Sequence, residues 1–159
     1  MYVCLSPWMG WLRDLAAARE GLHTDHASSR PLSPDYELVG LMGEAAFALQ
    51  FGLRIDRSLR PAGDKGIDFW VKGASVDVKT ARKAKNMIVE VGKVSADLYV
   101  LGQYYDDGVD LLGWEWGEEM SRCPSRDFGY GILNHFKEVA LLHNMGEWET
   151  RGEMERGHG

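Results

Sequence analysis

The sequence predicts a single α/β domain, and three observations support this fold class. Residues 67–79 alternate apolar and polar side chains with a period of two, which is typical of β-strands. Residues 35–51 repeat apolar side chains with a helical period, and residues 97–104 form a strongly β-prone run. The chain has 159 residues and a hydrophobic content of 45%, which suits one sizeable core. We assign the domain to residues 1–143, followed by a polar acidic tail at 144–159 that can be disordered.

The N-terminal half is predicted to hold two helices and a strand. Residues 1–22 are expected to be helical because their apolar side chains lie on one side, at Trp8, Trp11, Leu12 and Leu15. Ser33 is a suitable N-cap for the second helix, with Pro34 at its first position, and Gly52 is expected to end that helix. Residues 53–59 are then predicted to form a strand, followed by a glycine-containing loop.

The C-terminal half is predicted to be mostly strands. One strand is expected at residues 87–91 and a central one at 97–104. Residues 109–116 are expected to pair with the central strand across a short Asp-Asp-Gly turn. A short helix can begin at Gly117, and residues 130–142 can form one more short element.

The composition sets limits on the compartment and on some kinds of site. Cys4 and Cys123 lie far apart and neither belongs to a CxxC pair, so we expect no zinc site and no disulfide framework. The first residues lack a basic region, which argues against a secretory signal, and no apolar run is long enough to span a membrane. The sequence therefore predicts a cytoplasmic protein that does not bind membranes.

The charge is unevenly distributed. The net charge is -6, which by itself argues against a nucleic-acid partner. Residues 54–93, however, hold ten Lys or Arg against five Asp or Glu. This basic segment surrounds the acidic hairpin described next, as expected where a phosphate backbone approaches a metal site; chance clustering is the alternative.

The alternating segment is predicted to be a β-hairpin closed by a two-residue turn at Lys72-Gly73. The expected pairs are Val71 with Ala74, Phe69 with Val76, and Asp68 with Asp77. Residues directly opposite each other share a face, and Lys79 lies on that face two residues beyond Asp77. The other face is wholly apolar and is expected to pack on the core: Ile67, Phe69, Val71, Val76 and Val78.

The two opposed carboxylates repel each other, so the pair should hold a proton with a raised pKa or bind a cation. Carboxylate oxygens suit magnesium, manganese or calcium. Lys79 can offset part of the charge without a metal, and a solvated hairpin face with ordinary surface charges is the alternative. The interpretation depends on the register, because a loop one residue longer moves Asp68 to the other face.

A third acid, Glu44, lies in the second predicted helix among glycine and small apolar residues. Burying a carboxylate there is costly unless it is paired or binds a ligand. The alternative is that Glu44 lies on the exposed edge of the helix. Glu37, seven residues earlier, is the second choice on the same helix.

These acids together resemble the signature of the PD-(D/E)XK nuclease superfamily, which has the restriction-endonuclease-like fold. In that family a helix supplies one acid, a strand supplies the next, and a following strand carries an acid-x-Lys motif. Here the order is Glu44, Asp68, and then Asp77-x-Lys79. The family usually has proline before the first strand acid, whereas this sequence has isoleucine. The resemblance covers about half of the chain, residues 35–116.

The resemblance implies a mixed central β-sheet flanked by α-helices and Mg²⁺-dependent hydrolysis of DNA, with Mn²⁺ as a substitute ion. Asp68 and Asp77 would bind the metal together with the main-chain carbonyl of Val78. Glu44 would hold a water ligand or a second ion. Lys79 would orient the attacking water, help to deprotonate it, and stabilise charge in the transition state. The general chemistry agrees, since a phosphodiester is anionic and needs positive charge placed where negative charge develops.

Further residues are expected to contact nucleic acid or to pack. Arg82, Lys83 and Lys85 follow the acid-x-Lys motif and are candidates for phosphate contacts, with a solvated basic loop as the alternative. Trp114 and Trp116 alternate along a predicted strand, and we expect them to pack rather than to stack on bases.

The sequence thus predicts a metal-dependent deoxyribonuclease. The alternative is a catalytically inactive nucleic-acid- or protein-binding module on the same fold. The sequence does not exclude RNA, does not distinguish an endonuclease from an exonuclease, and leaves a homodimer open. No separate recognition domain is evident, which favours structure-directed or weakly specific cutting.

Overall fold

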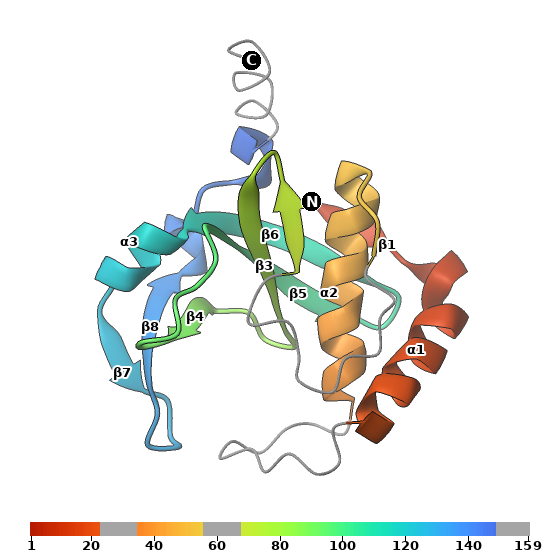
Figure 1. Cartoon of the computed structure of the whole chain (residues 1–159), viewed down its shortest axis with the longest axis horizontal. Helices are drawn as coiled ribbons and strands as arrows, with labels where there is room; N and C mark the ends of the chain where they lie inside the picture. Colours follow the sequence, from red (N-terminus) through yellow and green to blue (C-terminus); the bar gives the residue numbers. More distant parts are fainter. Residues whose placement is uncertain (23–34, 56–67, 149–159) are drawn as a thin grey trace.

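The computed structural model describes residues 1–22, 35–55 and 68–148. A five-stranded sheet in the order β1-β6-β5-β3-β2 forms the centre, and a three-stranded sheet in the order β4-β8-β7 lies beside it (Figure 1). In chain order the elements are β1 (Tyr2–Cys4), η1 (Ser6–Trp8), α1 (Met9–Leu22), α2 (Tyr36–Phe51), β2 (Phe69–Val71), β3 (Ala74–Ala81), β4 (Asn86–Glu90), β5 (Leu98–Tyr105), β6 (Gly108–Trp116), α3 (Gly117–Arg122), β7 (Ser125–Asp127), β8 (Leu133–Glu138) and η2 (Val139–Leu141).

The central sheet is mixed and is covered on both faces. β3 and β5 are parallel, whereas the other neighbours in the sheet are antiparallel. α2 packs on one face and α1 packs on α2, while the three-stranded sheet and α3 cover the other face (Figure 1). The chain is therefore an α/β protein with a mixed sheet flanked by helices, as the sequence predicts.

The β2–β3 hairpin has the predicted turn and two of the three predicted pairs; Asp68 and Asp77 are not paired. Lys72 and Gly73 both have positive φ angles, 51° and 83°, which is the conformation of a two-residue hairpin turn of type I′. Phe69 pairs with Val76 and Val71 pairs with Ala74. The apolar face packs on the main core through Phe69, Val76 and Val78, while Ile67 lies outside the described residues.

α2 is close to the predicted helix and ends where expected. Its C-cap, Gly52, has a φ of 66°, a left-handed conformation that glycine adopts without strain. The predicted N-cap, Ser33, lies outside the described residues, and the helix begins after Asp35. A Cβ on Gly43 would lie only 1.7 Å from the Thr80 hydroxyl oxygen, so a glycine there lets α2 approach β3 closely.

Two predicted elements near the N-terminus are wrong in part. The start of the predicted first helix is instead strand β1, whose Val3 pairs with Val109 of β6, because this segment completes the edge of the central sheet. Residues 53–55 are in no strand, and residues 56–59 lie outside the described part of the chain.

The end of the chain also differs from the sequence-based expectation. β7 was not anticipated, and the element predicted at residues 130–142 consists of β8 and η2. The tail is expected from residue 144 onward, yet Met145 is buried and Trp148 lies against Phe47 in an edge-to-face contact. Within the described ranges, no helix is both long enough and apolar enough to cross a membrane.

Candidate active site

Asp68 lies at the outer edge of β3, where regular pairing with β2 stops. Its amide donates to the Val76 carbonyl at 2.8 Å, and its carboxylate accepts from the Val78 amide at 2.7 Å. The carboxylate therefore takes the place that a neighbouring strand would occupy. It does not stand beside Asp77 on one face of the sheet, which is where the predicted register places it.

This position brings three acids together. The pKa of Asp68 is well above its ordinary value, first because the carboxyl is buried and then because the charges of Glu44 and Asp77 lie close to it. A hydrogen bond with Glu44 raises the pKa further, while the bond from the Val78 amide opposes the shift. Asp68, which directly precedes β2, thus meets Glu44 of α2 and Asp77 of β3.

The three acids reach this edge from different layers. Asp77 is in register with Tyr99 of β5, which belongs to the core under the second sheet, so Asp77 stands on that face. Glu44 comes from α2, which covers the opposite face. Asp68, in the plane of the sheet, bridges the two. The open edge of β3 is therefore the place where a ligand can reach all three carboxylates.

Lys79 pairs with one of these acids. Its ammonium lies 2.8 Å from a carboxylate oxygen of Asp77, which is buried. Burial acts to lower the pKa of Lys79, but the charge of Asp77 and the hydrogen bond to it outweigh this effect, and the pKa is raised. Lys79 is therefore a protonated donor in this arrangement rather than a proton acceptor.

Arg19 of α1 is a residue that the sequence did not point to. Its guanidinium lies 3.6 Å from a carboxylate oxygen of Glu44. The two residues belong to different helices, and no local pattern relates them. The signal that could have identified Arg19 is a cation in the last turn of a helix expected to pack on an acid-bearing one.

The donor atoms suit a hard divalent cation, but they are not gathered tightly enough to hold one as they stand. Among the described residues, no group of three or more His, Cys, Asp or Glu side chains is arranged to hold a metal ion. The available donors are oxygens: the carboxylates of Glu44, Asp68 and Asp77 and the carbonyl of Val78, which faces the same edge as the Val78 amide. A cation would relieve their repulsion and draw them closer.

The predicted phosphate contacts do not share one environment. Arg82 forms an ion pair with Asp35 and lies over the Tyr104 ring at 4.7 Å, so internal contacts hold it. Lys83 and Lys85 are exposed on the connection from β3 to β4, close to the end of the strand that carries Lys79. The two lysines are thus better placed than Arg82 to contact a polyanion.

The tryptophans of β6 pack, as expected. Trp114 is buried, and its ring meets that of Trp116 edge to face at 5.4 Å. The Trp114 indole nitrogen also donates to the Asn144 carbonyl at 3.1 Å. Trp114 is thus covered, and Trp116 is partly buried against the main core.

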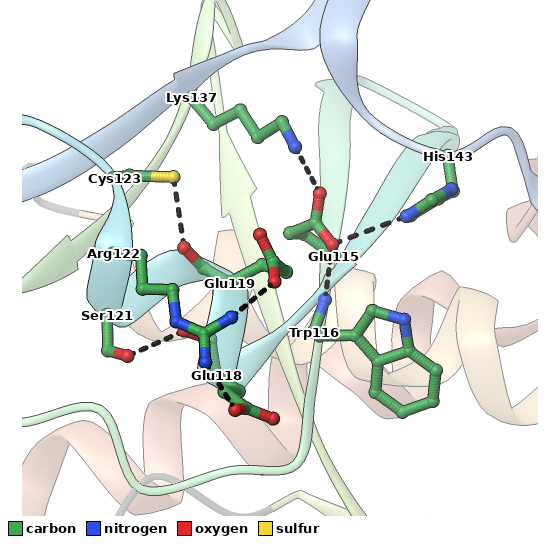
Figure 2. Close-up of polar contacts among 9 residues, drawn as sticks. All are labelled: Glu115, Trp116, Glu118, Glu119, Ser121, Arg122, Cys123, Lys137 and His143. Atoms are coloured by element: carbon green, nitrogen blue, oxygen red, sulfur yellow. Dashed lines mark hydrogen bonds and ion pairs between the residues drawn. The ribbon is translucent and has the colours of Figure 1, made fainter.

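A second polar cluster surrounds Glu115 of β6, which the sequence did not single out (Figure 2). Glu115 is 1% exposed; its carboxylate accepts from the Trp116 amide at 2.8 Å, pairs with Lys137 of β8, and lies 3.3 Å from Nε2 of His143. Nδ1 of His143 lies 3.0 Å from Glu147, so carboxylates occupy both ring nitrogens. This cluster joins the two sheets and the chain after η2, and it presents no unused catalytic group.

No family model, curated protein or solved structure matches this chain. The functional argument therefore rests on the geometry of the site itself.

Proposed function

We propose that the chain is a metal-dependent nuclease that hydrolyses phosphodiester bonds of DNA, on a restriction-endonuclease-like variant of its α/β fold. The observation that carries the proposal is the position of Asp68, which meets Glu44 and Asp77 at the open edge of β3 while Lys79 contacts Asp77. At this buried edge, carboxylates outnumber cationic side chains. This excess negative charge destabilises the fold, but it is what a cation-binding site needs.

Asp68, Asp77 and the Val78 carbonyl would hold a Mg²⁺ ion, with Glu44 holding a water ligand or a second ion. The bound ion would supply a water of lowered pKa and screen the phosphate oxygens. The protein's own contribution begins with Asp68, which the Val78 amide keeps at the edge of the strand. α2 fixes the third carboxylate, because Gly43 seats that helix directly against β3.

The protonation state of Lys79 refines its role. While it contacts Asp77, Lys79 has a raised pKa and is a protonated donor. As a donor it would give a hydrogen bond to an oxygen of the scissile phosphate. Its charge would then stabilise the developing negative charge. With Asp77 holding a cation, the Lys79 ammonium would be available for that contact.

The testing experiment incubates the purified chain with labelled single-stranded DNA, duplex DNA and RNA in Mg²⁺, Mn²⁺ or EDTA. Cleavage of DNA should require the divalent ion, and Asp77→Asn should reduce it by about 10²-fold or more, as for loss of one preorganised charge-stabilising group. Glu90→Gln is the matched control, since Glu90 is an acid at the end of β4, in the three-stranded sheet, and pairs with Lys93. Cleavage that survives in EDTA, or in Asp77→Asn, contradicts the proposal.

A non-catalytic binding module on the same fold is the second candidate, and one observation favours it. The Lys79–Asp77 and Arg19–Glu44 ion pairs neutralise part of the acidic charge without any metal. Calorimetry with Mg²⁺ and Mn²⁺ separates the two candidates. Heat of ion binding that Asp68→Asn abolishes supports the nuclease, whereas nucleic-acid binding with no ion binding and no cleavage supports the module.

A further inference from the structure

Trp70 of β2 is the most exposed large hydrophobic side chain in the described part of the chain. It is 65% exposed, whereas Trp8 is 42% exposed and Trp114 is buried. Indole rings are large apolar surfaces that folded proteins normally cover. An indole left open on a short strand therefore needs a reason.

The position of Trp70 relates it to the candidate active site. Trp70 is in register with Ser75, and residues in register share a face of the sheet. Ser75, Asp77 and Lys79 alternate along β3 on that same face. Trp70 is therefore a diagonal neighbour of Asp77, with about 7–8 Å between their Cα atoms. In the sequence, Trp70 follows Asp68 by two residues.

The surroundings of this face are polar. Lys72 lies two residues beyond Trp70, at the turn, and Lys79 lies at the other end of the face. A groove of about 660 Å³ begins at the turn and continues between the loop before β5 and α3. Its polar lining residues are Lys72, Ser95, Asp97, Glu118 and Ser121, and Val94 and Trp116 add apolar surface. This lining offers donors and acceptors, as the edge of a nucleobase requires.

We infer that Trp70 is a stacking platform for an unpaired nucleobase of a DNA strand whose phosphate lies at the cation that Asp68 and Asp77 would hold. The inference rests on the proposed function for the position of the phosphate. Aromatic side chains bind single strands by stacking on base faces, whereas in a duplex those faces are covered by neighbouring bases. Lys72, two residues beyond the exposed indole, adds a positive charge that suits a phosphate backbone carrying bases, so the preferred substrate is single-stranded or locally unpaired DNA.

The test measures the anisotropy of labelled DNA of about twelve nucleotides in Ca²⁺, a cation that suits carboxylate oxygens, and a gel run after each measurement checks that the DNA is intact. The full chain should bind the single strand more tightly than a blunt duplex of the same sequence. Trp70→Ala should weaken single-strand binding by about 5- to 150-fold, the range expected for one base stacked on an aromatic ring. Trp70→Phe should retain most of the affinity, and one abasic position in the strand should weaken binding to the wild type but not to Trp70→Ala. Trp8→Ala, another exposed tryptophan, is the control and should change nothing.

The outcomes separate this inference from the proposed function. Metal-dependent cleavage with equal affinities for wild type and Trp70→Ala overturns the stacking role and leaves the nuclease intact. Absence of cleavage with a large Trp70→Ala effect supports stacking and rejects the nuclease. A preference for duplex, no DNA binding at all, or a Trp70→Ala effect on the oligomeric state alone overturns the inference.

Discussion

Two regions of this molecule bury a carboxylate and treat its charge in opposite ways. Around Glu115, the neighbours are Lys137, His143 and a backbone amide, so the charge is balanced by groups of opposite character (Figure 2). Around Asp68, burial and the charges of Glu44 and Asp77 outweigh the hydrogen bond from the Val78 amide, and the pKa of Asp68 is raised. The buried Glu115 is thus neutralised by cationic neighbours, whereas the buried Asp68 is repelled by acidic ones.

The difference indicates what each region is for. A compensated buried carboxylate joins elements, and Glu115 joins β6 to β8 and to the chain after η2. A buried carboxylate without a partner of opposite charge destabilises the fold. Such a group is expected at a site where a bound ligand supplies the missing charge. Removing the acid should therefore weaken the protein at the first region and relieve it at the second.

The largest expected effect on stability is at the compensated region. Glu115→Gln should lower the free energy of unfolding by about 3–5 kcal/mol, because it leaves a partly buried Lys137 without its partner. Urea unfolding measures this change. The control is Glu119→Gln on α3, where the ion pair with Arg122 is exposed and the cost should stay below about 1 kcal/mol. Equal small costs at both positions would contradict the view of Glu115 as the joint between the sheets.

The next effect concerns the lysine of the uncompensated region. In the proposed mechanism, Lys79→Ala should reduce the rate of DNA cleavage by about 10²–10³-fold, because it would remove a donor to the transferring phosphate. Divalent-ion binding, followed by calorimetry, should change little. Lys93→Ala is the control, since Lys93 pairs with Glu90 in the same way at an exposed position. Loss of ion binding with unchanged turnover would contradict the role assigned to Lys79.

The packing of α2 on β3 can be tested by comparing two glycines of that helix. Gly43→Ala should destabilise the protein by roughly 1–3 kcal/mol and slow cleavage, because a methyl group there collides with Thr80 and moves Glu44 away from β3. Gly40→Ala meets nothing within 4 Å and should be neutral or stabilising by up to about 1 kcal/mol. Thermal unfolding and cleavage rates of both variants check this, and identical behaviour would mean that the close packing of α2 on β3 does not position Glu44.

The smallest effect is a dependence on pH. Because the pKa of Asp68 is raised in the folded chain, its contribution to stability is complete below the ordinary aspartate value of about 3.9 and is lost as the pH rises through the folded value. Without metal, Asp68→Asn should therefore gain stability relative to wild type as the pH rises. Added Mg²⁺ should stabilise the wild type more than the variant.

Asp127 provides a control of opposite sign. Hydrogen bonds from the amides of Gly129, Tyr130 and Gly131 hold the pKa of Asp127 below its ordinary value, the bond from Gly129 having the largest effect. Its contribution is present above the ordinary value and is lost as the pH falls through the lowered one. Asp127→Asn should therefore be less stable than the wild type at neutral pH, and this difference in stability should disappear at low pH. Parallel pH curves for the two variants would contradict the contrast between the regions.

Much of the local structure could be predicted from the sequence. The turn at Lys72-Gly73, the pairing of Phe69 with Val76 and the end of α2 at Gly52 all follow from patterns a few residues long. The candidate acids were also identifiable, because the acid-x-Lys spacing is local. Strand β1 was not, because its short segment is a strand only where β6 offers an edge to pair with.

The sequence by itself determined which acids and which lysine belong to the hairpin and to the helix, since alternation, turn chemistry and helical period are properties of short segments. Only the tertiary structure decided that Asp68 lies in the edge of β3 and meets Glu44, that Arg19 reaches Glu44, and that Glu115 is compensated. It also decided that Trp70 stays in solvent while Trp114 is covered. The physical reason is that charge and burial depend on neighbours, and these neighbours come from elements far apart in the chain.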